Sequence, residues 1–139
     1  KCNVKNFKPL QVNPQASMRD LLWLAMRNSP DRIIIGEVRD GSALDMLKAF
    51  NTGCRGGMAT IHANHAGAAI QRVIDLCLEV VANPPYTLVA EALDIIVHID
   101  ANAKHPAKRQ VTEIIEVGGF DAEQLKMTTR PLCERRLAA

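Results

Sequence analysis

Residues 32–40 of the chain read Arg32-Ile33-Ile34-Ile35-Gly36-Glu37-Val38-Arg39-Asp40. Three consecutive isoleucines are typical of a short strand that is buried on both faces, as at the centre of a parallel sheet. The strand would end at a glycine and deliver Glu37 to its carboxyl end, which is the edge where open α/β sheets bind ligands. A carboxylate there can orient a water or a magnesium ion beside a nucleotide phosphate. Taken alone, the pattern also fits a strand that simply leaves the core.

An extended arm and a helix are expected upstream of this strand. Residues 1–14 alternate loosely between apolar and polar side chains and end in a turn signal. Ser17 and Asp20 then have the spacing of a capping box, apolar residues follow at helical spacing, and Pro30 ends the pattern. The strand at 32–36 therefore follows a helix directly.

Further strands and helices are expected downstream. The helix-start signal recurs at Ser42 and Asp45, and Gly53 suits the C-terminal cap of that helix. Asn64 is expected to cap a later helix. The other expected elements are strands at 58–61, 95–99, 111–117 and 125–128, a helix from 64 to about 81, and a short helix at 87–93. Strands and helices thus alternate first, and short connections favour an antiparallel β-meander afterwards.

The composition is that of one ordinary globular domain or part of one. The 139 residues are 47% hydrophobic and 23% charged with a net charge of +2, and no face concentrates enough Lys and Arg to predict nucleic-acid binding. The four cysteines occur singly, which is typical of reduced thiols rather than of a disulfide or zinc framework. No apolar run approaches the roughly 20 residues that span a bilayer. We expect one partial domain over 1–139, with a flexible tail over 131–139.

The second strand, like the first, ends in polar side chains. Thr60 and His62 follow the apolar residues of that strand. Neighbouring parallel strands would bring Glu37 and His62 to the same rim of the sheet. A carboxylate that polarises the attacking water, beside a polar group that senses the γ-phosphate, suits phosphoanhydride hydrolysis. The alternative is that His62 flanks the next helix and hydrogen-bonds to backbone.

Two long segments resemble a known family. Residues 28–40 resemble the Walker B region of the type II/type IV secretion ATPase superfamily, and residues 51–64 resemble its histidine box. The strands at 92–99 and 113–117 also fit the conjugal-transfer branch, the TrbB ATPases, which serve type IV secretion. The similarity covers roughly residues 10–120. It implies the C-terminal portion of a RecA-like P-loop NTPase core, with central parallel strands and helices followed by an antiparallel meander.

The resemblance assigns roles to two residues. Glu37 matches the acidic residue of the Walker B box, the candidate for water activation and for magnesium support. Gly36 stands where other P-loop proteins have the Walker B Asp, so metal contact through water is the expected mode. His62 matches the histidine of the Thr-x-His-Ala-Asn segment, which resembles a γ-phosphate or subunit-coupling sensor.

Four further residues are candidates for nucleotide or subunit-interface contacts. Arg39 and Arg27 fall where the family has basic residues near the nucleotide or the neighbouring subunit, and either could instead be a surface ion-pair partner. Thr60 precedes His62 in the histidine box. Arg72 follows that box on a helix, where an arginine is usually solvated.

The chain departs from the family pattern in two respects. Cys54 stands where the family normally has a histidine, and a thiol does not replace an imidazole as a cation at neutral pH. Cys54 with His62 and His65 does not have a zinc spacing. In addition, the sequence contains no Gly-x-x-x-x-Gly-Lys-Ser/Thr loop. In the family that loop lies upstream of the position of Lys1, so we expect a fragment that does not turn over ATP appreciably alone.

The resemblance implies an ATP- and Mg²⁺-dependent motor subunit of a conjugative type IV secretion system. Such a motor would form a homo-hexamer at the cytoplasmic face of a bacterial inner membrane, beside other components of the machinery, and would power pilus assembly or DNA or protein transfer. Two alternatives stay open. One is a pilus-assembly or type II secretion ATPase, and the other is a non-catalytic ring or scaffold module.

Overall fold

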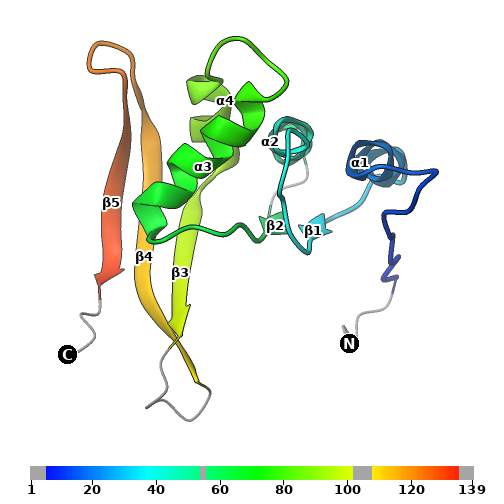
Figure 1. Ribbon diagram of the computed structural model, residues 1–139, viewed down its shortest axis with the longest axis horizontal. Coiled ribbons are helices and arrows are strands. Elements are labelled where there is room, and N and C mark those ends of the chain that lie inside the picture. The colour runs from blue at the N-terminus through cyan, green and yellow to red at the C-terminus, as the bar shows by residue number, and fades with distance from the viewer. Residues whose placement is uncertain (1–5, 54–55, 102–107, 135–139) are drawn as a thin grey trace.

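The computed structural model describes residues 6–53, 56–101 and 108–134 (Figure 1). Strands and helices alternate in the first part of the chain, and an antiparallel sheet follows, which confirms the predicted α/β class. In chain order the elements are α1 (Met18–Arg27), β1 (Ile34–Ile35), α2 (Ala43–Asn51), β2 (Met58–Ala59), α3 (Ala66–Leu78), α4 (Tyr86–Ala92), β3 (Ile95–Ala101), β4 (Arg109–Asp121) and β5 (Lys126–Glu134).

β1 and β2 form a short parallel pair. The register pairs Ile34 with Met58 and Ile35 with Ala59. Two backbone hydrogen bonds of 3.0 Å extend the pairing, one from the Met58 amide to the Ile33 carbonyl and one from the Val38 amide to the Thr60 carbonyl. The strands are shorter than the predicted ranges 32–36 and 58–61, since regular pairing covers only two residues on each chain segment.

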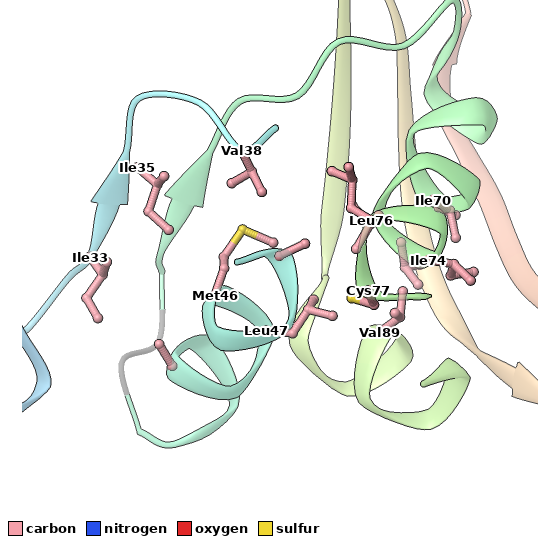
Figure 2. Close-up of a cluster of buried hydrophobic side chains, with 14 of the residues drawn as sticks. Ile33, Ile35, Val38, Met46, Leu47, Ile70, Ile74, Leu76, Cys77 and Val89 are labelled. Carbon is pink, nitrogen blue, oxygen red and sulfur yellow. The ribbon is translucent and has the colours of Figure 1, made fainter. Parts of the chain in front are cut away.

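The pair is buried on one face only. Ile33 and Ile35 are 6% and 5% exposed and belong to the buried hydrophobic cluster that also contains Met46 of α2 (Figure 2). Ile34 and its partner Met58 are 55% and 56% exposed. The prediction of a strand buried on both faces and placed at the sheet centre is therefore wrong. Successive side chains of a strand point to opposite faces, and no described segment covers the face that Ile34 shares with Met58.

The start of α1 confirms a local signal. The Ser17 hydroxyl accepts a 3.3 Å hydrogen bond from the Asp20 amide, and the Asp20 carboxylate accepts a 2.9 Å bond from the Ser17 amide. These reciprocal bonds satisfy amide groups that have no partner within the helix. Downstream of the first sheet strand, Gly53 has a φ of +99° after α2, which agrees with its predicted role as a C-terminal cap.

The starts of α2 and α3 differ from the predictions. Ser42 has helical backbone angles and its side chain caps nothing; its amide instead donates to the Asp40 carboxylate at 2.9 Å. At α3 the capping side chain belongs to His65, whose Nδ1 accepts from the Ala68 amide at 3.1 Å, and not to Asn64.

Within the described part of the chain, none of the helices combines the length and apolarity that crossing a bilayer requires.

The second sheet has the order β3-β4-β5 and is antiparallel throughout. α3 lies along one face of this sheet, and α4 lies between α2 and the sheet (Figure 1). The most deeply buried side chains come from these helices and from α2, and Figure 2 shows them together: Leu47, Leu76, Cys77 and Val89. The hydrophobic core therefore lies where the three helices and the antiparallel sheet meet.

The antiparallel strands are longer than predicted. Gly118 and Gly119 do not end β4, because the ladder with β5 continues past them through a register shift between Val117 and Gly119. Gly119 has a φ of +148°, which glycine adopts readily in a bulge. Pro131 pairs with Ile115, so residues 131–134 of the tail predicted over 131–139 belong to a strand, and residues 135–139 lie outside the described part of the chain. Proline is tolerated there because β5 is an edge strand of the described sheet.

Candidate functional site

The ends of β1 and β2 bring the two principal candidates together. β1 leads into Glu37 and β2 leads into His62, and the Val38–Thr60 backbone hydrogen bond holds these segments side by side. His62 Nε2 lies 2.9 Å from Glu37 Oε1. The prediction that an acid and an imidazole share one rim of the sheet agrees with this geometry.

Glu37 is enclosed while its partners are open to solvent. Its side chain is 23% exposed, against 92% for His62 and 76% for Arg39. Arg39 Nη2 donates to Glu37 Oε2 at 2.5 Å. Oε1 is buried and accepts no hydrogen bond of good geometry from the described residues, so its 2.9 Å approach to His62 is not an aligned hydrogen bond; it is an ion pair when the imidazole is protonated. One carboxylate oxygen thus lacks a donor, and a ligand or a water reaches it once the His62 ring moves aside.

Arg39 tunes the acidity of Glu37. Its hydrogen bond lowers the pKa of Glu37 below the ordinary value; partial burial acts in the opposite direction, and the charges of Arg39 and His62 add smaller contributions that lower the pKa. The carboxyl group is therefore ionised at neutral pH. An ionised carboxylate can accept a proton from water or support a cation, which a protonated carboxyl group cannot do.

A hollow of about 280 Å³ opens beside these side chains. Its lining consists of Glu37, Val38, Arg39, Ile61, His62 and Arg72. Arg72 reaches it from α3, so two guanidinium groups and an imidazole surround one carboxylate. This balance of charge suits an anion with several oxygen atoms, because guanidinium groups bind phosphate oxygens well.

The structure separates two of the predicted residues from the hollow. Arg27 lies in the last turn of α1 and is not among the lining residues. Thr60 does not line the hollow either; its hydroxyl donates to the Gly36 carbonyl. The predicted position of Cys54 lies outside the described residues.

The described residues offer a single carboxylate for a cation at this rim. Among residues 6–53, 56–101 and 108–134, no group of three or more His, Cys, Asp and Glu side chains could hold a metal ion. Mg²⁺ commonly uses one or two carboxylates, several waters and the substrate phosphates, and does not need an all-protein cage. Glu37, with its unbonded buried Oε1, fits that limited role.

Sequence reasoning missed Glu113. Its carboxylate accepts a 2.8 Å hydrogen bond from the Ala66 amide and so caps α3, which begins four residues after His62. The two partners are 47 positions apart, and no local pattern links them. A carboxylate at a helix N-terminus is stabilising because it satisfies a free amide and complements the helix dipole.

Comparison with known proteins shows what this chain is similar to. A family model described as "Type II/IV secretion system protein" matches residues 2–134. The probable conjugal transfer protein TrbB of Sinorhizobium fredii is 40% identical over 135 residues, which are 97% of this chain and 41% of that protein. The type IV secretion system protein PtlH of Bordetella pertussis is 36% identical over 115 residues, 76% of this chain and 33% of that protein. The chain thus spans less than half the length of either relative.

A solved structure confirms the fold class. The VirB11 ATPase from the Brucella suis type IV secretion system, in complex with sulphate, superimposes with a TM-score of 0.59 at 23% identity. The match covers 68% of this chain and 31% of that chain. At this identity the likeness establishes a common RecA-like fold and says nothing further about chemistry.

Proposed function

Because the chain belongs to the type II/IV secretion system protein family, we propose that it carries the water-activating side of an ATP-hydrolysing motor of type IV secretion, in the branch that serves conjugal transfer. The observation that carries the proposal is the 2.9 Å approach of His62 Nε2 to Glu37 Oε1 at the rim of the parallel pair. The similarity to TrbB over 97% of the chain favours conjugal transfer over pilus assembly or type II secretion.

Glu37 acts on the attacking water. Its lowered pKa keeps the carboxylate ionised, and its buried Oε1 has no hydrogen-bond donor, so this oxygen can accept one from a water when the His62 ring moves aside. His62 lies beside the same oxygen and is well placed to respond to the charge of a terminal phosphate. An oriented carboxylate that removes a proton in the transition state typically contributes about 10²–10⁴-fold to the rate.

Arg39 and Arg72 bind phosphate oxygens from two sides of the hollow. Arg39 must share its guanidinium between Glu37 and the phosphate, since it already donates to Glu37 Oε2. A magnesium ion bound with the nucleotide would neutralise phosphate charge. Glu37 would hold that ion through a water, which agrees with its being the single carboxylate of the hollow.

The remaining parts of the site come from outside these residues. The sequence contains no phosphate-binding Gly-x-x-x-x-Gly-Lys-Ser/Thr loop, so we propose that another segment or subunit supplies it. The open hollow is consistent with a site that is closed at a subunit interface of a homo-hexamer. By analogy with the secretion proteins that it resembles, we place the motor at the cytoplasmic face of the inner membrane, beside other components of the secretion machinery.

The test compares ATP hydrolysis by the full-length parent with that of Glu37→Gln and His62→Ala. We expect Glu37→Gln to lower kcat at least about 100-fold, because an amide does not accept a proton. His62→Ala is expected to cause a smaller loss. The matched control is Glu123→Gln, which makes the same change at an exposed turn outside the hollow and should leave kcat unaltered.

Three outcomes would contradict the proposal. Wild-type turnover by Glu37→Gln would remove that residue from the mechanism. A parent without ATP turnover would favour the non-catalytic scaffold. The 139-residue chain is expected to show no appreciable turnover, and turnover that Glu37→Gln leaves unchanged would contradict the assignment directly.

A further inference from the structure

Thr60 forms hydrogen bonds with the residues on both sides of Glu37. Its hydroxyl donates to the carbonyl of Gly36, the residue before Glu37. Its own carbonyl accepts a 3.0 Å hydrogen bond from the amide of Val38, the residue after Glu37. One residue of the β2 segment therefore holds both neighbours of the carboxylate.

These bonds matter because regular pairing has ended at this point. The register of β1 and β2 stops at the pair Ile35 and Ala59, one residue before Gly36 and Thr60. Gly36 has no Cβ, and a Cβ placed there would meet no atom within 4 Å, so packing does not hold the backbone on this side of Glu37, whereas the buried Val38 side chain anchors the other side. On the Gly36 side the position of Glu37 thus depends on hydrogen bonds, and Thr60 donates one to Gly36 and accepts another from Val38.

Thr60 also sets where His62 lies. In extended chain, residues two apart share a face, so the segment that is tied to Gly36 carries His62 toward the same side. His62 Nε2 then reaches Glu37 Oε1 at 2.9 Å. Loss of the hydroxyl bond would leave the backbone bond from the Val38 amide as the remaining tie between the two segments at this point, so we expect the distance between carboxylate and imidazole to increase.

The same bond argues against a direct contact between Thr60 and a nucleotide. The hydroxyl proton is already donated to the Gly36 carbonyl, and Thr60 is not among the residues that line the hollow. A hydroxyl that contacts phosphate would need that proton as its donor. We propose that Thr60 is a positioning residue, which holds Glu37 opposite His62 and makes no contact with nucleotide.

The first test measures how strongly His62 acts on Glu37, by ¹³C NMR titration of the Glu37 carboxyl group in the 139-residue chain. In the 139-residue chain with Thr60 intact, His62→Ala should raise the pKa of Glu37, because the charge of His62 helps to lower it. In a Thr60→Val background, His62→Ala should cause a smaller rise, since the two side chains then lie farther apart. Arg39 also lowers the pKa of Glu37, but it is present in every variant, so its contribution cancels when the effects of His62→Ala are compared.

Two variants serve as controls. Thr60→Ser keeps the hydroxyl, so it should retain the wild-type response of Glu37 to His62→Ala. Thr128→Val removes a closely matched bond in the other sheet, where the Thr128 hydroxyl donates to the Gly119 carbonyl of the neighbouring strand at 3.2 Å. It should leave the response intact, which separates positioning from general loosening of the fold.

Either of two results would overturn the inference. One is a full His62 effect in the Thr60→Val background. The other is a loss of the effect in Thr60→Ser equal to that in Thr60→Val, because the methyl group and not the hydroxyl would then be responsible. If the valine variant fails to fold, Thr60→Ala, which removes the same hydroxyl, takes its place in the comparison.

A second readout rests on the proposed function and uses the full-length parent. A positioning role predicts that Thr60→Val lowers kcat for ATP while KM stays close to the wild-type value, and that Thr60→Ser restores kcat. A rise in KM with unchanged kcat would instead identify a nucleotide contact and overturn the inference. If the parent does not hydrolyse ATP, the proposed function fails, and the NMR result still decides the role of Thr60.

Discussion

The two sheets of this molecule differ in extent, coverage and chemistry. The parallel pair has a register of two residue pairs and leaves Ile34 and Met58 exposed on one face, yet its rim carries Glu37 and His62. In the antiparallel sheet, β3, β4 and β5 span 7, 13 and 9 residues, and α3 and α4 pack against it. The candidate site therefore lies on the sheet with fewer hydrogen bonds, where a ligand can shift the backbone at low cost.

A hydrogen bond at the start of α3 links the histidine segment to the antiparallel sheet. Glu113 of β4 accepts from the Ala66 amide at the start of α3, directly after the segment that carries His62. The antiparallel sheet thus fixes the far end of the histidine segment, while Thr60 fixes its near end. From their extent and coverage we expect the two sheets to differ in stability.

The largest contrast is expected in thiol labelling, which reports how well the helices cover the antiparallel sheet. Cys77 of α3 is 0% exposed, and burial raises its pKa to about 11. Cys133 of β5 is exposed. At about pH 8 we expect iodoacetamide to label Cys77 at least about 100-fold more slowly than Cys133, because the reactive thiolate is scarce and enclosed. Peptide mapping measures both rates, and similar rates in the folded chain would mean that the core opens readily.

The next largest difference is expected in the free energy of unfolding when a side chain of each region is truncated. Leu76 is 0% exposed between α3 and its neighbours, so Leu76→Ala should lower the free energy of unfolding by about 2–5 kcal/mol. Ile34→Ala, on the bare face of β1, should change it by less than about 0.5 kcal/mol. Urea unfolding of both variants gives the comparison. Equal losses would show that the parallel pair is as firmly packed as the core.

The link between the regions should have an intermediate effect. Glu113→Ala removes the acceptor of the Ala66 amide, so we expect a loss of about 1 kcal/mol in the free energy of unfolding and faster hydrogen exchange at Ala66. Glu113→Gln keeps an acceptor oxygen and should lose less. If the alanine variant exchanges at the wild-type rate, α3 does not depend on β4 at this point.

The smallest effect is expected in the stability of α1 at low pH. Hydrogen bonds from Ser17 lower the pKa of Asp20 below 3.8, and hydrogen bonds from Ser42 lower that of Asp40. A carboxyl group with a lowered pKa in the folded state contributes stability that is fully present above its unfolded pKa and is lost as the pH falls through the folded value. Amide exchange in α1 should therefore accelerate below about pH 3.8 before that of β4. Asp20→Asn should abolish this dependence in α1; if it persists, another group is responsible.

Much of the local structure could be predicted because it depends on nearby residues. The capping box of Ser17 and Asp20 and the apolar stripe of α3 follow from patterns within one helix. The meeting of Glu37 and His62 was predicted because parallel strands end at a common edge. The resemblance to secretion ATPases supplied the roles of these two residues, and the family match agrees with it.

Other features could not be predicted because they depend on partners far along the chain. Three isoleucines in a row indicate a strand, but not that Ile34 would lie on an uncovered face. The continuation of β4 past Gly118 depends on hydrogen bonds with β5 that keep the bulged segment in the sheet.

The amino-acid order alone specified the element types, the family and the two residues at the rim, because periodicity, caps and motifs act over a few positions. Only the tertiary structure revealed that the Thr60 hydroxyl donates to the Gly36 carbonyl and that Glu113 caps a helix 47 positions away. A side chain with several possible hydrogen-bond partners takes the one that tertiary packing brings within reach, and that choice has no local signature.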